Sequence, residues 1–315
     1  MSRRGWVLFA AMSVIWGIPY LLIKIAVTGV PVPVLVLARV AAGAVILLPI
    51  ALRRGELGVL RPHWRWLAVF ACVEIILPWL FLSQAERRLS SSMSGLLIAS
   101  VPIIVVVLGR LTGGTERLSA VRWAGLLVGL AGVGLLVGPG AEGGDAWAIT
   151  ECLLVAVCYA IGPLIASRRL GGLPPLGMTA VCLGFAALVY SAPAALTWPG
   201  SWPSARVLWC LAGLAVICTA AAFVIFFRLI AEVGPARASV ITYVNPAVAV
   251  TLGVSVLGER LTPAMAGAFA LIIAGSVLAT RPGGREARTP RTPRTPRPET
   301  GPQPEPEPQP APGPS

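Results

Sequence analysis

The feature that most constrains this chain is an internal repeat of strongly apolar sequence. Residues 101–137, VPIIVVVLGRLTGGTERLSAVRWAGLLVGLAGVGLLV, return in outline at 244–280 as VNPAVAVTLGVSVLGERLTPAMAGAFALIIAGSVLAT. Pro102 corresponds to Pro246 at an offset of 144 residues, and Glu116 corresponds to Glu259 at an offset of 143. Two matched apolar halves of this length predict a membrane protein built by internal duplication.

The composition supports a membrane protein. The chain is 56% hydrophobic and only 12% charged, whereas a soluble protein of 315 residues needs more charge to cover its surface. The apolar residues form blocks of about 20, which at 1.5 Å per residue cross a hydrocarbon layer of about 30 Å. The net charge of +12 comes from arginines that flank these blocks, so it indicates orientation among membrane lipids and not nucleic-acid binding.

The apolar blocks predict ten membrane spans with short connections rich in Gly and Pro. The spans run near 5–27, 31–51, 64–85, 91–111, 120–138, 147–167, 175–196, 207–230, 236–257 and 263–280. Five spans per half give the halves opposite orientations. The predicted fold is therefore an all-α integral membrane protein with ten transmembrane helices arranged as two inverted five-helix repeats.

The domain boundaries follow from the repeat. Residues 1–140 form the first five-helix repeat and residues 141–281 form the second. Residues 282–315 are rich in Pro, Arg and Glu, and we expect a disordered cytoplasmic tail. Most flanking arginines lie on the side of the N-terminus, with Arg87, Arg88, Arg206 and Arg260 as exceptions, so both termini are predicted to be cytoplasmic.

Two ionisable residues lie deep within predicted spans. Arg39 is about 12 Å from the outer end of the second span, and Glu74 is about 15 Å from the inner end of the third, at 1.5 Å per residue. Both therefore lie near the middle of the membrane. One interpretation is a structural ion pair between adjacent helices. The other is functional, with Glu74 as a proton-coupling carboxylate and Arg39 as the docking point for a substrate carboxylate.

Helix-breaking residues recur at matching places in the two halves. Gly17-Ile18-Pro19 corresponds to Gly162-Pro163, and Pro102 corresponds to Pro246. Proline removes a backbone hydrogen bond and leaves a carbonyl free to face a cavity. Paired breakers at repeat-related positions therefore predict a substrate site between the halves.

Aromatic and polar residues surround these breakers. They could line an amphipathic pocket or could equally be packing residues. The predicted substrate-binding and translocation residues are Trp16, Tyr20, Arg39, Glu74, Pro102, Tyr159, Tyr243, Asn245 and Pro246.

Other residues within spans have simpler interpretations. Lys24 is expected to extend to the outer interface, and Glu151 lies near the outer edge of the sixth span. Small residues recur in the fifth and tenth spans, which predicts close helix packing and a possible homodimer face. These residues are Gly125, Gly129 and Gly132, with Gly267, Ala270 and Ala274 in the second half.

Signatures of soluble enzymes are absent from the sequence. It has no GxxxxGK[ST], GxSxG or HExxH motif, and its six cysteines show no metal-ligand spacing. His63 is the only histidine. We therefore predict no catalytic residues, no metal, no cofactor and no enzymatic activity.

These residues together resemble the EamA-type transporters of the drug/metabolite transporter superfamily. The likeness rests on Trp16-Gly17 with Lys24, on Arg39, and on the two prolines that are each followed by a glutamate before a Gly/Ala-rich span. It covers about 5–280 and excludes the tail. Ile18 and Pro19 depart from it, because a small polar residue is common there, and no arginine in the second half matches Arg39.

The resemblance implies spans one to four and six to nine around a central cavity, with spans five and ten peripheral. It also implies proton-driven export of small metabolites, commonly amino acids. We predict a secondary transporter in a bacterial inner membrane that exports a small amphipathic metabolite by alternating access. A flippase for a lipid-linked metabolite, a membrane-embedded enzyme and a non-transporting scaffold or sensor are the alternatives.

Overall fold

The computed structural model describes residues 2–111, 119–137, 145–238 and 240–280, and every regular element within them is a helix. The all-helical prediction is therefore confirmed for the described residues. Within these ranges, eight helices or stacked helix runs are long and apolar enough to cross a membrane, and two further apolar helices have 17 residues each. Glu116 and the predicted tail lie outside the described residues.

The helices of the two predicted halves follow the apolar blocks. The first half contains α1 Arg3–Ile15, α2 Ile18–Ala26, α3 Val32–Arg53, α4 Leu57–Leu60, η1 Arg61–His63, α5 Trp64–Ala71, η2 Cys72–Ile76, α6 Leu77–Ala85, α7 Ser91–Ile98, α8 Val101–Leu111 and α9 Ala120–Val137. The second half contains α10 Ala146–Arg169, α11 Pro175–Leu196, α12 Ala205–Ala212, η3 Gly213–Ala221, α13 Ala222–Val233, α14 Pro235–Ala238, α15 Ile241–Leu257 and α16 Pro263–Ala279.

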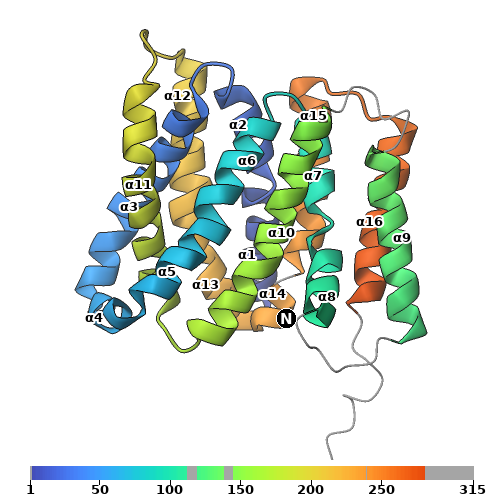
Figure 1. The fold of residues 1–315 in the computed structure, drawn as a ribbon, viewed down its shortest axis with the longest axis horizontal. Helices are drawn as coiled ribbons and strands as arrows, with labels where there is room; N and C mark the ends of the chain where they lie inside the picture. The colour runs from blue at the N-terminus through green and yellow to red at the C-terminus, as the bar shows by residue number, and fades with distance from the viewer. Residues whose placement is uncertain (1, 112–118, 138–144, 239, 281–315) are drawn as a thin grey trace, which may run out of the picture. The chain divides into compact units, whose positions relative to one another are not determined.

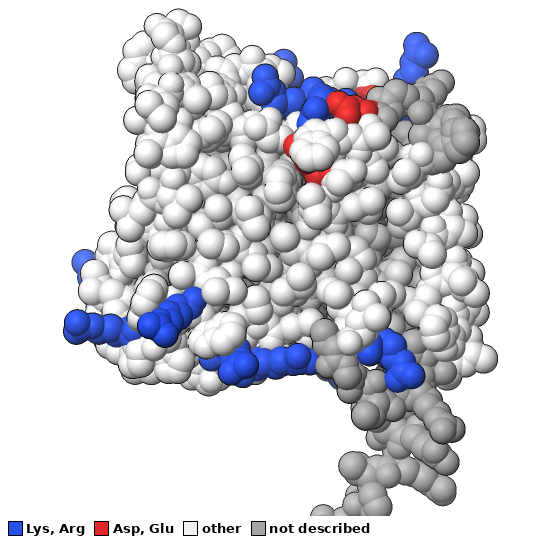
Figure 2. Space-filling view, viewed as in Figure 1, with Lys and Arg blue, Asp and Glu red and all other residues white. Residues whose placement is uncertain are grey.

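Successive helix runs point in alternating directions, so the connections lie at two opposite edges of the bundle (Figure 1). We call the edge where α1 begins the N-terminal edge. The opposite edge, which carries residues 86–90 and 258–262, is the α6–α7 edge. On the face shown in Figure 2, Lys and Arg lie along both edges, the visible Asp and Glu lie near the α6–α7 edge, and a broad band without charged side chains lies between.

The band between the edges exposes large apolar side chains. Val45, Leu188 and Trp209 are each more than 70% exposed. A water-soluble surface rarely carries contiguous apolar patches of this size, whereas a lipid-facing surface requires them. The fold is therefore that of an integral membrane protein.

Repeat-related helices pack against each other: α9 lies along α16 and α11 lies along α3. In α9 the predicted small-residue face of Gly125, Gly129 and Gly132 makes this contact. The partner face in α16 is different from the predicted one. Its buried members include Ala268, Gly275 and Ala279, whereas Ala270 and Ala274 are exposed. A homodimer through the α9 face would therefore have to displace α16.

The contact between α9 and α16 depends on glycine. A Cβ atom at Gly275 would collide with the backbone of Gly129 and with the carbonyl oxygen of Gly125. The two helix backbones therefore touch directly, as in other small-residue contacts between membrane helices.

We predict that Gly275→Ala lowers the stability of the detergent-solubilised protein by roughly 1–3 kcal/mol, because backbone atoms cannot move aside for the added methyl group. Gly134→Ala is the matched control, since that glycine is also helical and has open space around it. Thermal unfolding of both variants checks the prediction. Equal midpoints for the two would contradict it.

Candidate functional site

The two π-helices of the structure occupy repeat-related positions. The 143-residue offset carries η2, Cys72–Ile76, onto residues 215–219, which lie inside η3. A π-helix widens the helical turn and is often found at functional sites. Here η2 carries Glu74 and η3 carries Thr219. The sequence analysis missed Thr219, although a hydroxyl within an apolar span was a signal that could have found it.

Arg39 of α3 is buried, with 6% of its surface exposed. Its Nε donates to Oγ1 of Thr219 at 2.9 Å, and that hydroxyl donates to the carbonyl oxygen of Leu214 at 2.8 Å. The guanidinium carbon lies 3.5 Å from the ring centroid of Trp79, a cation–π contact. The partners of Arg39 in this contact set are neutral.

Glu74 does not pair with Arg39. Among the described residues no ion pair joins them, so the interpretation as a structural ion pair is wrong. Oε2 of Glu74 is buried without a hydrogen-bond partner in the part of the chain that the structure describes. It lies against Gly162 of α10, where any side chain would collide with it. Gly162, predicted as a helix breaker, therefore makes room for this carboxyl.

Two tyrosines complete the group around Arg39 and Glu74. Tyr159 of α10 interacts electrostatically with both of them, and Tyr20 of α2 interacts with Tyr159 and Arg39. We call Tyr20, Arg39, Glu74, Trp79, Tyr159 and Thr219 the central polar cluster. Its members come from α2, α3, η2, α6, α10 and η3, so both halves contribute to it.

Asn245 has a different position, at a break in the first span. Between α1 and α2 the N–H of Gly17 bonds to the carbonyl of Val14, so it does not reach the carbonyl of Ser13. In the amide orientation that pairs donors with acceptors, the side-chain NH2 of Asn245 donates to that carbonyl at 3.1 Å and to the carbonyl of Ile241 at 3.0 Å. Asn245 therefore supplies the hydrogen bond that the helix break removes.

Trp16 and Tyr243 also lie outside the central polar cluster. The Trp16 ring packs on Phe226 and Phe223 of α13, with centroids 4.6 and 6.1 Å apart. The Tyr243 hydroxyl is 2.9 Å from Oγ1 of Thr280, directly after α16. The repeat relates Trp16 to Tyr159, but the structure gives them different surroundings.

The matched prolines do not produce matched breaks. The first span breaks before Pro19 and the fourth breaks at Ala99–Ser100, just before Pro102. In the second half, α10 continues through Pro163 and α15 through Pro246. Pro19 and Pro102 lie in the first turn of α2 and α8, where a missing N–H has no partner to lose.

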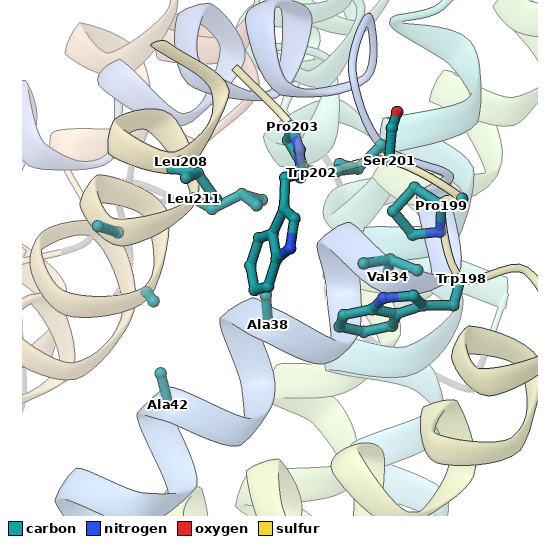
Figure 3. Close-up of a pocket in the computed structure, with 14 residues that line it drawn as sticks. Val34, Ala38, Ala42, Trp198, Pro199, Ser201, Trp202, Pro203, Leu208 and Leu211 are labelled. Carbon is teal, nitrogen blue, oxygen red and sulfur yellow. The ribbon is translucent and has the colours of Figure 1, made fainter. Parts of the chain in front are cut away.

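A pocket of about 580 Å³ lies between α3, α12 and the connection 197–204. Trp202 and Trp198 lie over it, and Val34, Ala38 and Ala42 line it from α3 (Figure 3). Its lining carries no charged side chain and includes no predicted site residue. Arg39 is buried on α3 and does not line the pocket, so the pocket and the central polar cluster share this helix but no residue.

Lys24 and Arg88, near the α6–α7 edge, have partners that the sequence analysis did not predict. Nζ of Lys24 donates to the carbonyl oxygens of Glu86 and Leu89, at 2.7 and 2.6 Å, so it does not extend into the lipid interface. Arg88 pairs with Glu151 at 2.8 Å and with Asp145 at 3.1 Å. These carboxylates compensate the charge of an arginine that opposed the overall orientation bias.

Comparisons with known proteins agree with the architecture. The model of the EamA-like transporter family matches residues 3–138 and 146–281. The uncharacterised inner membrane transporter YedA of Escherichia coli K12 is 28% identical over 86% of this chain and 88% of its own length. A probable terminal-alkyne amino-acid exporter of Streptantibioticus cattleyicolor is 28% identical over 92% and 98%. A crystal structure 26% identical to this chain covers 89% of it and 98% of its own chain, with a TM-score of 0.62.

The hydroxyl of Thr219 is expected to stabilise the buried guanidinium. Thr219→Val keeps the shape but leaves Nε of Arg39 without its acceptor, and should lower stability by roughly 1–3 kcal/mol. Thr251→Val is the control, because Thr251 makes the same hydroxyl-to-carbonyl bond at 2.8 Å but is exposed. Thermal unfolding in detergent measures both. A loss of equal size in the two variants would show that the contact with Arg39 contributes nothing.

Proposed function

Because this chain belongs to the EamA-like transporter family, we propose that it exports an amino acid or a similar small amphipathic metabolite by alternating access, coupled to proton entry. That it is a membrane transporter follows from its family and its relatives. The substrate, the coupling and the mechanism are our proposal. We also propose that the protein moves its substrate without converting it chemically.

The observation that carries the proposal is the unpaired charge of the central polar cluster. Arg39 is buried in contact with a hydroxyl and an indole, and Glu74 has a carboxyl oxygen without a partner. Unpaired ionisable groups at membrane depth are costly and are a mark of transport pathways. An amino acid brings a carboxylate that suits Arg39 and an ammonium group that suits Glu74. The similarity to the probable amino-acid exporter of Streptantibioticus cattleyicolor supports this substrate class.

Glu74 is our candidate for the coupling carboxylate. The same carboxyl can hold either a proton or the ammonium group of the substrate, because both neutralise it. Competition between the two for one buried site is sufficient to exchange substrate for protons across the membrane. Tyr20 and Tyr159 line the same cluster and are proposed to contact the substrate.

Alternating access rests on the relation between the halves. We propose that ten spans form two inverted repeats, which is supported by the alternating helix directions and by the two stretches that match the family model (Figure 1). Pro102 and Pro246 are proposed to sit at the substrate pathway. We place the N-terminal edge and both termini in the cytoplasm, because most arginines that flank the helix runs lie at that edge, among them Arg53 at the end of α3 and Arg169 at the end of α10.

A flippase for a lipid-linked metabolite is the second candidate, and the pocket between α3 and α12 favours it. The pocket is apolar and exposed tryptophans lie beside it, as expected for a site that takes an acyl chain at the membrane interface (Figure 3). Trp202 is 87% exposed and Trp198 is 62% exposed. In this case the substrate would enter sideways from the lipid.

We predict that inside-out vesicles with an imposed pH gradient accumulate amino acids, and that Glu74→Gln abolishes accumulation above equilibrium, because a neutral amide binds no proton. Glu56→Gln is the control, since Glu56 lies at the N-terminal edge and accepts from the N–H of Gly177 at 2.8 Å. Uptake of labelled amino acids measures both. Gradient-driven uptake that survives in Glu74→Gln would remove Glu74 from the coupling mechanism.

The flippase candidate predicts that filling the pocket blocks transport. Ala38→Trp should lower translocation of a fluorescent lipid-linked substrate by at least about tenfold, equivalent to about 1.4 kcal/mol. Ala131→Trp is the control, because Ala131 is exposed on α9, away from the pocket. The flippase candidate fails if Ala38→Trp and Ala131→Trp both transport amino acids normally and neither variant translocates the lipid-linked substrate.

A further inference from the structure

Glu86 is a buried carboxyl to which the sequence analysis assigned no role. It directly follows α6 at the α6–α7 edge, and its side chain is 0% exposed. Neither of its carboxyl oxygens has a hydrogen-bond partner in the described part of the chain. A buried polar group without a partner is rare in proteins and requires an explanation.

The groups that face Glu86 come from several elements. Its carboxyl interacts electrostatically with Lys24 and Tyr20 of α2, Cys152 of α10, Arg39 of α3, and Glu259 of the connection between α15 and α16. The Lys24 ammonium is the strongest of the favourable charges. It donates to main-chain carbonyls, however, and forms no ion pair with the Glu86 carboxyl among the described residues.

An ionised Glu86 would be an unpaired buried charge, whose desolvation costs several kcal/mol in a protein interior. Burial therefore raises the pKa of the Glu86 carboxyl well above its ordinary value, and the Lys24 ammonium opposes this shift without cancelling it. The conformation described here therefore favours the protonated form of Glu86.

The burial of Glu86 depends on how the segment Glu86–Ser92 is held. Lys24 binds the carbonyls of Glu86 and Leu89, and Arg88 binds α10 through Glu151 and Asp145.

Glu259 holds the far end of the segment. Its carboxylate accepts from the N–H of Ser91 at 2.7 Å, and from the N–H and hydroxyl of Ser92 at 3.0 and 2.6 Å. Two of the three attachments join the first half of the chain to the second. Opening the α6–α7 edge would therefore break them and would admit water to Glu86.

We propose that Glu86 is a proton-binding site that gates the α6–α7 edge, which closes only when this carboxyl has taken a proton from the water at that edge. On opening, the carboxylic acid returns its proton to water and becomes a hydrated carboxylate. The proposal rests on the alternating access proposed above and adds a second proton site to Glu74.

The sign of the pH dependence follows from linkage. The closed form binds the Glu86 proton more tightly than the open form does, so protons favour closure and a rise in pH favours opening. Between the two pKa values of Glu86, in the open and the closed form, the ratio of open to closed molecules should rise by about tenfold per pH unit. Below both values it should not change.

Hydrogen–deuterium exchange of residues 86–98 tests this link without any substrate. Wild type should exchange faster than Glu86→Gln as pH rises, because the amide cannot ionise and keeps the edge closed. Comparing the two at each pH removes the intrinsic pH dependence of exchange. Glu151→Gln is the control, since it weakens the contact to Arg88 and should speed exchange at every pH. Equal exchange in wild type and Glu86→Gln at all pH values would overturn the proposal.

A second measurement keeps Glu86 intact in case its variant does not fold. Infrared spectroscopy of the Glu74→Gln protein at neutral pH should still show the C=O stretch of a protonated carboxyl group, and that band should disappear at alkaline pH. Its absence at neutral pH would overturn the proposal. If both measurements succeed but vesicles show no gradient-driven transport, the gate stands and the proposed proton-coupled export fails.

Discussion

The constraint on which this structure depends is that backbone N–H and C=O groups in a membrane must find partners within the protein. This is why the described chain is helical wherever it is regular, and why the interruption of the first span is repaired. At the break between α1 and α2, Asn245 of α15 donates to the carbonyl of Ser13, which the N–H of Gly17 has left. The same contact leaves no room for a side chain on Gly17, which lies against Val248. Asn245, which the sequence analysis predicted to line the substrate site, therefore joins the first span to α15.

The carboxyl groups in and beside the spans have two kinds of surroundings. Glu151 is paired with Arg88, and Glu259 accepts three hydrogen bonds at the start of α7, so both have the partners that a charge requires. Glu74 and Glu86 have carboxyl oxygens without partners. The first two hold the α6–α7 edge together. The second two are the groups whose state can change when a proton arrives, and this difference is why we place coupling and gating there.

Prediction from the sequence succeeded where a property repeats along the chain. Blocks of apolar residues located the helices of the described chain. It failed where partners had to be chosen. Arg39 contacts Thr219, about 180 residues away in sequence, and not Glu74. Lys24 binds the end of α6, and Tyr243 reaches Thr280 beside α16. The matched prolines also interrupt helices only in the first half.

The sequence by itself determined that this chain is helical, that it lies in a membrane and that its family is one of transporters, because apolar length and internal repetition are properties of the chain alone. Only the tertiary structure decided which buried charges have partners. In a soluble helix the polar face shows which side is turned outward. In a span that is apolar all round, that signal is missing. The surroundings of Arg39 on α3, and of Glu86 after α6, are therefore fixed only when distant helices pack around them.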